Sequence, residues 1–282
     1  YPKKFRQGIR GSFMKKFKVR NYRYPSKKIK EETGRVRFCA FSDLHGLSFG
    51  EQNSRLIGQI QKCCPDGIFV AGDMFVREDQ KTMETARDLL SRLAKEFPVW
   101  YALGNHEYSM ILNPQYRKIY LEYEDALQDT GVIFLHNSWC EFQVRETSFV
   151  VHGLELEHEY YGKPRTPDLT LEHMEDLIGK PEEDAYHILL AHNPRYGRTY
   201  FDWGAQLTIC GHYHGGMIRF GKRTGLISPQ FQLLPSYCCG DFHRGDSHLL
   251  VSAGIGEHTI PVRIHNPREL LQIDIYPEKH PK

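Results

Sequence analysis

The chain has 282 residues, and its hydrophobic content of 40% is typical of a globular protein that can bury a sizeable core. No apolar run approaches the roughly 18 residues that a membrane-spanning helix needs, and the basic opening has no apolar signal-peptide core. The net charge of +2 hides an asymmetry, because residues 1–30 carry twelve of the 37 Lys and Arg residues and no acidic residue. The rest of the chain therefore has 25 basic against 35 acidic residues.

Residues 1–34 are predicted to form a basic N-terminal arm, with a removed membrane anchor expected upstream of Tyr1. A segment with many Lys and Arg residues and no Asp or Glu residue is typical of one that binds an anionic membrane or nucleic acid. A solvated surface segment can have the same pattern. The net acidic remainder of the chain disfavours nucleic acid. Aromatic residues between the cations favour the membrane, so insertion at its interface is expected for Phe5, Phe13, Phe17, Tyr22 and Tyr24.

Apolar and amphipathic segments alternate in the first half of the chain. The apolar segments predict buried strands at 35–41, 67–71 and 99–103, and the amphipathic ones predict helices at 53–63 and 84–97. Strands that alternate with helices form βαβ units, so we expect parallel pairing with right-handed crossovers. In such sheets, ligands bind beyond the carboxyl ends of the strands.

In the second half of the chain, the short segments at 132–135, 141–144 and 149–151 suit a more antiparallel arrangement. Helices are predicted near 115–127 and at 169–178, with strands at 132–135, 141–144, 149–151, 186–191, 207–210, 249–252 and 270–275. No internal repeat or low-complexity linker divides the chain. The expected fold is α/β, a two-sheet β-sandwich flanked by helices, in a single domain over residues 35–282.

Five polar clusters close or follow the apolar segments. They are Asp43-Leu-His45, Gly72-Asp73, Gly104-Asn105-His106-Glu107, His192 and Gly211-His212-Tyr213-His214. The clusters offer carboxylate, amide and imidazole groups but no thiolate, a set that suits manganese, iron or zinc ions that activate water against phosphorus. One His-x-His pair arises easily by chance, whereas five clusters at strand ends indicate a centre with two divalent metal ions.

The order of these clusters resembles the calcineurin-like metallophosphoesterase superfamily, and the resemblance covers nearly everything after residue 35. It implies two metal ions with a shared carboxylate: one held by Asp43, His45 and His214, the other by Asn105, His192 and His212, with Asp73 bridging them. It also assigns to His106 the donation of a proton to the leaving oxygen, which a near-neutral pKa permits. Independently, a carboxylate between two cations reduces their repulsion, and a hydroxide in the same gap can attack a phosphoester.

One departure from the resemblance concerns the residue that orients His106. Many relatives carry an acid a few residues after Gly-Asp, whereas this chain has Asp73-Met-Phe-Val-Arg77. Glu107, Asp79 or a backbone carbonyl is the expected replacement. Arg77 itself is a candidate to bind the substrate phosphate, and a solvent-facing loop arginine is the alternative.

Seven cysteines with two vicinal pairs make a poor disulfide framework, which favours a reducing compartment. We therefore expect the protein in the cytoplasm or at the cytoplasmic face of the membrane, where basic residues flank membrane anchors. An exported enzyme associated with the cell envelope is the alternative.

The glycine-rich tail, at 221–229, 252–256 and 260–267, is similar to a bacterial branch of often membrane-linked phosphoesterases. That branch includes relatives that act on UDP-diacylglucosamine, a lipid A precursor. The expected activity is hydrolysis of a phosphodiester, pyrophosphate or phosphomonoester in a lipid- or nucleotide-linked small molecule. The alternatives are a nuclease, a cyclic-nucleotide phosphodiesterase and a catalytically silent binding module, and the complete ligand set argues against the last.

Overall fold

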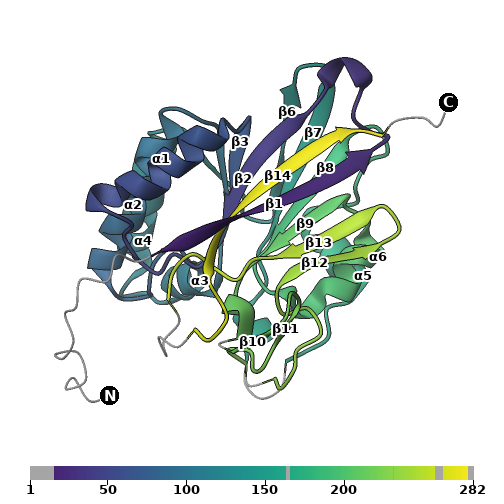
Figure 1. The fold of residues 1–282 in the computed structure, drawn as a ribbon. Coiled ribbons are helices and arrows are strands. Elements are labelled where there is room, and N and C mark those ends of the chain that lie inside the picture. Colours follow the sequence, from purple (N-terminus) through teal and green to yellow (C-terminus); the bar gives the residue numbers. More distant parts are fainter. Residues whose placement is uncertain (1–15, 163–165, 217, 231, 258–262, 279–282) are drawn as a thin grey trace.

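Two β-sheets packed face to face form the centre of the molecule, with helices on both outer faces (Figure 1). The computed structural model describes residues 16–162, 166–216, 218–230, 232–257 and 263–278. The first sheet contains, in spatial order, β1 (Phe17–Ser26), β14 (Arg268–Pro277), β2 (Val36–Phe41), β3 (Gly67–Ala71), β4 (Val99–Ala102) and β5 (Val132–Phe134). The second contains β12 (Gly240–Arg244), β13 (Ser247–Val251), β9 (Leu207–Cys210), β8 (Tyr186–Ala191), β7 (Thr147–Leu154) and β6 (Ser138–Val144).

The helices divide between the two outer faces. The first sheet is covered by α1 (Ser54–Cys63), α2 (Gln80–Ala94), α3 (Asn105–Leu112) and α4 (Arg117–Gln128), and the second by α5 (Leu171–Ile178) and α6 (Gly197–Trp203). This arrangement confirms the predicted α/β sandwich flanked by helices. The sequence analysis did not predict α3 or α6.

Parallel pairing brings the carboxyl ends of the central strands to one edge of the molecule. β2, β3, β4 and β5 pair in parallel, and so do β7, β8, β9 and β13. The antiparallel arrangement expected after residue 131 holds for β6 with β7, whereas β5 joins the first sheet in parallel with β4. The polar clusters that follow β2, β3, β4, β8 and β9 therefore meet at one edge.

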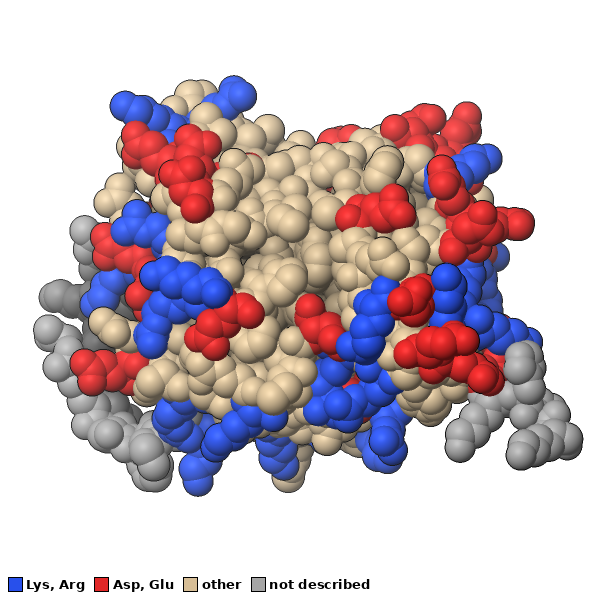
Figure 2. All heavy atoms as spheres, turned by 90° about the horizontal axis from the view of Figure 1, so that it is seen from above, with Lys and Arg blue, Asp and Glu red and all other residues tan. Residues whose placement is uncertain are grey.

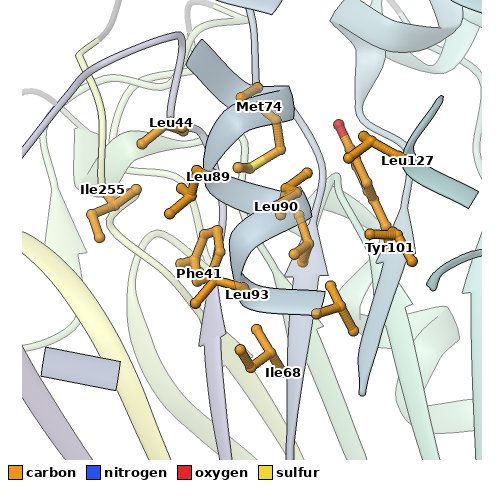
Figure 3. Close-up of a cluster of buried hydrophobic side chains, with 14 of the residues drawn as sticks. Phe41, Leu44, Ile68, Met74, Leu89, Leu90, Leu93, Tyr101, Leu127 and Ile255 are labelled. Atoms are coloured by element: carbon orange, nitrogen blue, oxygen red, sulfur yellow. The ribbon is translucent and has the colours of Figure 1, made fainter. Parts of the chain in front are cut away.

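Successive side chains of β2 point to opposite faces of the first sheet and pack into two separate hydrophobic cores. Phe38 and Ala40 point into the core between the two sheets, whereas Cys39 and Phe41 face the helices. On the helical side, the apolar stripe of α2 packs over the first sheet, with Leu89, Leu90 and Leu93 near Phe41 and Ile68 (Figure 3). Burying each such side chain contributes about 1.5–3 kcal/mol, so this core holds the strand ends firmly.

Part of the predicted basic arm belongs to the first sheet. β1 pairs in parallel with β14 along its whole length, and the ring centroids of Phe17 and Phe49 lie 5.0 Å apart. Tyr24 is 3% exposed, and Nε of Arg20 donates to the Glu269 carboxylate over 3.3 Å. The structure differs here from the expected arm over 1–34, because residues 17–26 form a strand of the first sheet in which Tyr24 is buried and Phe17 and Tyr22 are partly buried. Phe5 and Phe13 lie outside the described residues.

No helix within the described ranges is both long and apolar enough to cross a bilayer. The seven cysteines are free thiols in the structure.

Candidate metal centre

The predicted ligands come together at the edge where both sheets end. Asp43 and His45 follow β2, Asp73 follows β3, and Asn105 begins α3 shortly after β4. The second sheet contributes the three remaining histidines after β8 and β9. Ligand atoms lie within 4.8 Å of one another in three groups: Asp43, His45 and His214; Asp73, His192 and His212; and His45, Asp73 and His106. Asp73 therefore lies between the two predicted metal positions.

The first group is centred on the buried carboxylate of Asp43. Its Oδ1 lies 3.3 Å from Nε2 of His214, which in turn lies 3.1 Å from Nε2 of His45. Two imidazole nitrogens that face each other at this distance share one proton or bind one cation. The Ser42 hydroxyl donates to Asp43 Oδ2 over 2.5 Å, and the backbone N–H of His212 donates to Oδ1 over 3.0 Å. These two donors fix the carboxylate in place.

The second group contains buried polar atoms without hydrogen-bond partners. Nδ1–H of His192 donates to the Ala71 carbonyl over 2.6 Å, which leaves Nε2 as the free lone pair, 3.1 Å from Asp73 Oδ2. Nε2 of His192, Nε2 of His212 and Oδ1 of Asn105 are buried and accept no hydrogen bond. Each such atom costs about 1–3 kcal/mol if it stays unpaired, so their convergence fits a bound cation. The donor set suits manganese, iron or zinc.

Burial and neighbouring charges set the protonation of the ligands. Burial raises the pKa of Asp73, but nearby histidines outweigh it and hold that pKa well below its usual range. Burial lowers the pKa of His45 to about 3, and it also lowers the pKa of His212. Burial opposes protonation of His192 as well, but Asp73 and Asp43 raise its pKa to about 10, and a cation there would replace that proton. Ionised carboxylates with neutral imidazoles are the forms that bind metals.

The backbone of the site is strained. Five of the candidate ligands have the left-handed conformation that non-glycine residues rarely adopt: Asp43 (φ 54°), His45 (47°), Asp73 (56°), His212 (65°) and His214 (47°). Such conformations cost of order 1–3 kcal/mol each and persist only where the surrounding structure enforces them. In this site, the left-handed backbone conformations turn the candidate ligand side chains toward the metal centre.

Glu107 is a buried carboxylate that connects the ends of β3 and β4. It accepts hydrogen bonds from the backbone N–H groups of Asp73 (3.0 Å), Met74 (2.7 Å) and Gly104 (3.1 Å), and from the Tyr101 hydroxyl (2.6 Å). Burial raises the pKa of Glu107 and Asp73 raises it further, whereas the Tyr101 hydrogen bond lowers it. Glycine is an accepted N-cap residue, and Glu107 at the third helical position accepts from its N–H, so Gly104 and Glu107 could have predicted the start of α3.

His106 is oriented by a backbone amide and not by an acid. The N–H of Arg77 donates to Nδ1 of His106 over 3.0 Å, so the proton of the neutral ring lies on Nε2, which faces Asp73 Oδ2 at 3.9 Å. Burial lowers the pKa of His106. None of the three expected replacements has this role among the described residues: Glu107 connects the strand ends, Asp79 caps α2 by accepting from the Thr82 N–H, and no carbonyl of the described chain is bonded to the ring.

Two residues beside the centre were not predicted. Tyr161, from the short 3-10 helix η3 (His158–Tyr161), packs edge-on against the His212 ring with centroids 5.2 Å apart. The Arg263 guanidinium donates to the carbonyls of Ala253 and Gly256 and lies 3.3 Å from His214 Nδ1. Tyr161 belongs to no motif, and Arg263 lies in the 260–267 segment of the tail, to which the sequence analysis gave no role at the centre, because long-range packing places both residues here.

A cavity of ≈ 230 Å³ lies between the loop after β3, α3 and η3, and it is lined by Arg77, whose N–H contacts His106. Arg77, which the sequence analysis proposed to bind substrate, is one of its walls. The other walls combine polar and apolar side chains, among them Ser109, Leu112, Asn113, Tyr116 and His158.

A helix-flanked sandwich with buried carboxylates, imidazoles and an amide at its strand ends defines a metal-binding hydrolase. The family model for calcineurin-like phosphoesterases matches residues 36–216, which include His106 and every candidate ligand. The chain therefore belongs to the calcineurin-like phosphoesterase family.

Similar proteins have low sequence identity to this chain, but the similarity extends over most of its length. An uncharacterized protein of Bacillus subtilis, YpbG, is 23% identical over 257 residues, with 87% of this chain and 83% of YpbG covered. The phosphodiesterase YaeI of Escherichia coli is 23% identical over 235 residues, with 81% and 78% covered. Among solved structures, the phosphopantetheinyl hydrolase PptH of Mycobacterium tuberculosis superposes with a TM-score of 0.45 at 15% identity, with 78% and 89% covered.

Proposed function

We propose that the protein hydrolyses a phosphoester bond with the help of two divalent cations. The observation that carries the proposal is the convergence of buried, unpartnered ligand atoms with two ionised carboxylates at one edge of the sheets. Two such ions would supply positive charge for the phosphate and activate the attacking water. One ion would be held by Asp43, His45 and His214 and the other by Asn105, His192 and His212, with Asp73 between them.

His106 is proposed to assist departure of the leaving oxygen. The Arg77 N–H on Nδ1 directs the Nε2–H group of the ring toward Asp73 and the centre. From that position His106 can donate a hydrogen bond or a proton to the oxygen that leaves phosphorus.

We propose a phosphodiester or pyrophosphate of a lipid- or nucleotide-linked small molecule as substrate, similar to the substrates of UDP-diacylglucosamine hydrolase-type enzymes. The cavity beside His106 supports an organic group on the phosphate, because it offers the apolar Leu112 and the aromatic Tyr116 next to the Arg77 cation. The name of the relative YaeI, a phosphodiesterase, supports a diester. Arg77 would then bind a phosphate oxygen of the substrate.

The test of the metal-dependent reaction is Asp73→Ala, with Asp246→Ala as an exposed acidic control. Metal content and turnover of bis(p-nitrophenyl) phosphate with added manganese, iron or zinc are measured for both variants. Asp73→Ala should lose bound metal and turnover while the control matches the wild type. Two retained ions and the wild-type rate in Asp73→Ala would refute the two-metal proposal.

The role of His106 is tested with a series of leaving groups. His106→Asn should retain its metals and lose roughly 10²–10⁴-fold in rate, with a smaller loss for good leaving groups that need less help. A loss that is equal for good and poor leaving groups contradicts donation to the leaving oxygen.

A substrate panel separates the proposal from its alternatives. A phosphomonoester, a phosphodiester, a nucleotide-linked lipid, a cyclic nucleotide and DNA are compared for wild type and Arg77→Ala. Preference for the nucleotide-linked lipid, with a raised KM in Arg77→Ala, is the expected result. Preference for DNA or the cyclic nucleotide would instead show a nuclease or a cyclic-nucleotide phosphodiesterase, and the absence of any turnover would show a binding module.

For the setting of the enzyme we propose the cytoplasmic face of a membrane. Free cysteines and the cations of residues 1–30 support it. Compartment-specific labelling of the full chain in cells tests this location, and protection from a cytoplasmic label would favour the exported alternative.

A further inference from the structure

Four large apolar side chains are exposed on one small unit. The hairpin of β10 (Arg219–Phe220) and β11 (Thr224–Gly225) belongs to this unit, and bridges pair Ile218 with Ile264 and Ile227 with Leu233. The exposed side chains, here called the hairpin surface, are Phe220 (55% exposed), Leu233 (70%), Leu234 (55%) and Ile264 (45%). Scattered exposed apolar residues are ordinary, whereas several on one unit mark an interaction site.

The charged residues in the chain segment that forms the hairpin are all basic. Residues 215–237 contain Arg219, Lys222 and Arg223 and no Asp or Glu. Arg219 is buried and donates to the Lys222 carbonyl over 2.6 Å, whereas the side chains of Lys222 and Arg223 are exposed. At the opposite end of the molecule, Figure 2 shows Asp and Glu side chains mixed with Lys and Arg side chains around the rim. An anionic partner is therefore favoured at the hairpin.

Backbone contacts attach the hairpin surface directly to the metal centre. The candidate ligand His214 begins the 3-10 helix η5 (His214–Gly216), and the Gly216 carbonyl accepts from the Leu226 N–H over 3.2 Å. Leu226 also donates to the Ile218 carbonyl over 2.8 Å, and its own carbonyl accepts from the Leu234 N–H. The hairpin surface therefore lies a few residues from a ligand.

The chain also enters the fold at this end. β14 is antiparallel to β2, and β1 is parallel to β14, so Phe17 lies at the edge where β2 ends (Figure 1). Lys16, the first described residue, therefore lies on the side of the metal centre.

We propose that the hairpin surface docks on an anionic membrane and places the metal centre beside lipid phosphoesters. The lipid substrate class rests on the proposed function, but the docking does not. Apolar side chains enter the boundary between headgroups and acyl chains, and Lys222 and Arg223 contact anionic headgroups. This surface, and not the aromatic residues of β1, is then the part of the folded protein that contacts lipid.

The test is co-sedimentation of the full chain with vesicles of phosphatidylcholine alone or mixed with phosphatidylglycerol, at low and high salt. The hairpin variant is Phe220→Ser with Leu233→Ser and Leu234→Ser, and the matched control is Trp139→Ser with Leu121→Ser, which are 60% and 45% exposed on other elements. The hairpin variant should bind mixed vesicles at least tenfold more weakly, and the control should bind like the wild type. All variants are first checked for an unchanged melting temperature.

A second pair of variants separates the hairpin cations from those of β1. Lys222→Ser with Arg223→Ser should weaken binding to mixed vesicles at low salt, whereas Lys18→Ser with Arg23→Ser should leave it unchanged. Loss of binding only in the β1 pair, or a hairpin variant that sediments like the wild type, would overturn the proposal. So would a hairpin variant that changes only the self-association of the protein.

Turnover of soluble bis(p-nitrophenyl) phosphate distinguishes the two proposals. The hairpin variant should retain the wild-type rate with this substrate, because none of its changed residues is a candidate ligand. Vesicle binding without turnover in the wild type would refute the proposed function and leave the docking intact. Turnover with equally weak binding to both vesicle types would refute the docking alone.

Discussion

The carboxylate of Glu107 offers a sharp test of how the metal centre is held. In Glu107→Gln, one amide oxygen can still accept from Met74 N–H and the Tyr101 hydroxyl, which share Oε1. The amide NH₂ then meets the N–H groups of Asp73 and Gly104, which donate to Oε2 in the wild type. Burial raises the pKa of Glu107 to about 7, so above that pH two hydrogen bonds to a charged acceptor are lost at about 1.5–3 kcal/mol each, or about 3–6 kcal/mol in total.

Such a loss is a large part of the 5–15 kcal/mol that stabilises a typical protein. Urea unfolding of the metal-free variant should show it, and metal titration should show weaker binding because the Asp73 loop is released. Tyr101→Phe is the matched control, since it removes one donor and leaves both loops connected. A Glu107→Gln variant that unfolds within 1 kcal/mol of the wild type and keeps its metal affinity would refute the reasoning.

Three further predictions concern the scaffold. Burial lowers the pKa of His136, but Glu124 and Glu155 outweigh it and raise that pKa to about 9. The stabilisation of the fold by protonated His136 is therefore complete below the pKa of an unfolded histidine, about 6.5, and it is lost as the pH rises through 9. His136→Gln should therefore lower the melting temperature at pH 6 and not at pH 10. Asp79→Ala removes the cap of α2 and should cost about 0.5–2 kcal/mol in urea unfolding, unlike Asp88→Ala within the same helix, whose carboxylate is partly exposed and caps nothing. Gly104→Ala would place a Cβ 2.2 Å from Asp73 Oδ1, so its metal affinity should fall, whereas Gly58→Ala, with no atom within 4 Å, should leave it unchanged.

The sequence predicted the strands that carry the ligands better than the elements around them. The strands at 67–71, 186–191 and 207–210 match β3, β8 and β9, because short apolar runs that end in polar motifs have few other interpretations. β1 was missed because its cations conceal the aromatic residues that it buries. The orientation of His106 was not predictable, since the donor is the backbone N–H of Arg77 and any residue at that position offers the same group.

The two ends of the described chain leave the sandwich on opposite sides. β1 starts at the edge of the metal centre, and β14, which runs parallel to it, ends at the far edge with Pro277 (Figure 1). A sensor chip or bead coupled at Pro277 would therefore display the metal centre and the hairpin toward the solution. Coupling at Phe17 would turn the same end toward the support and obstruct large substrates or vesicles.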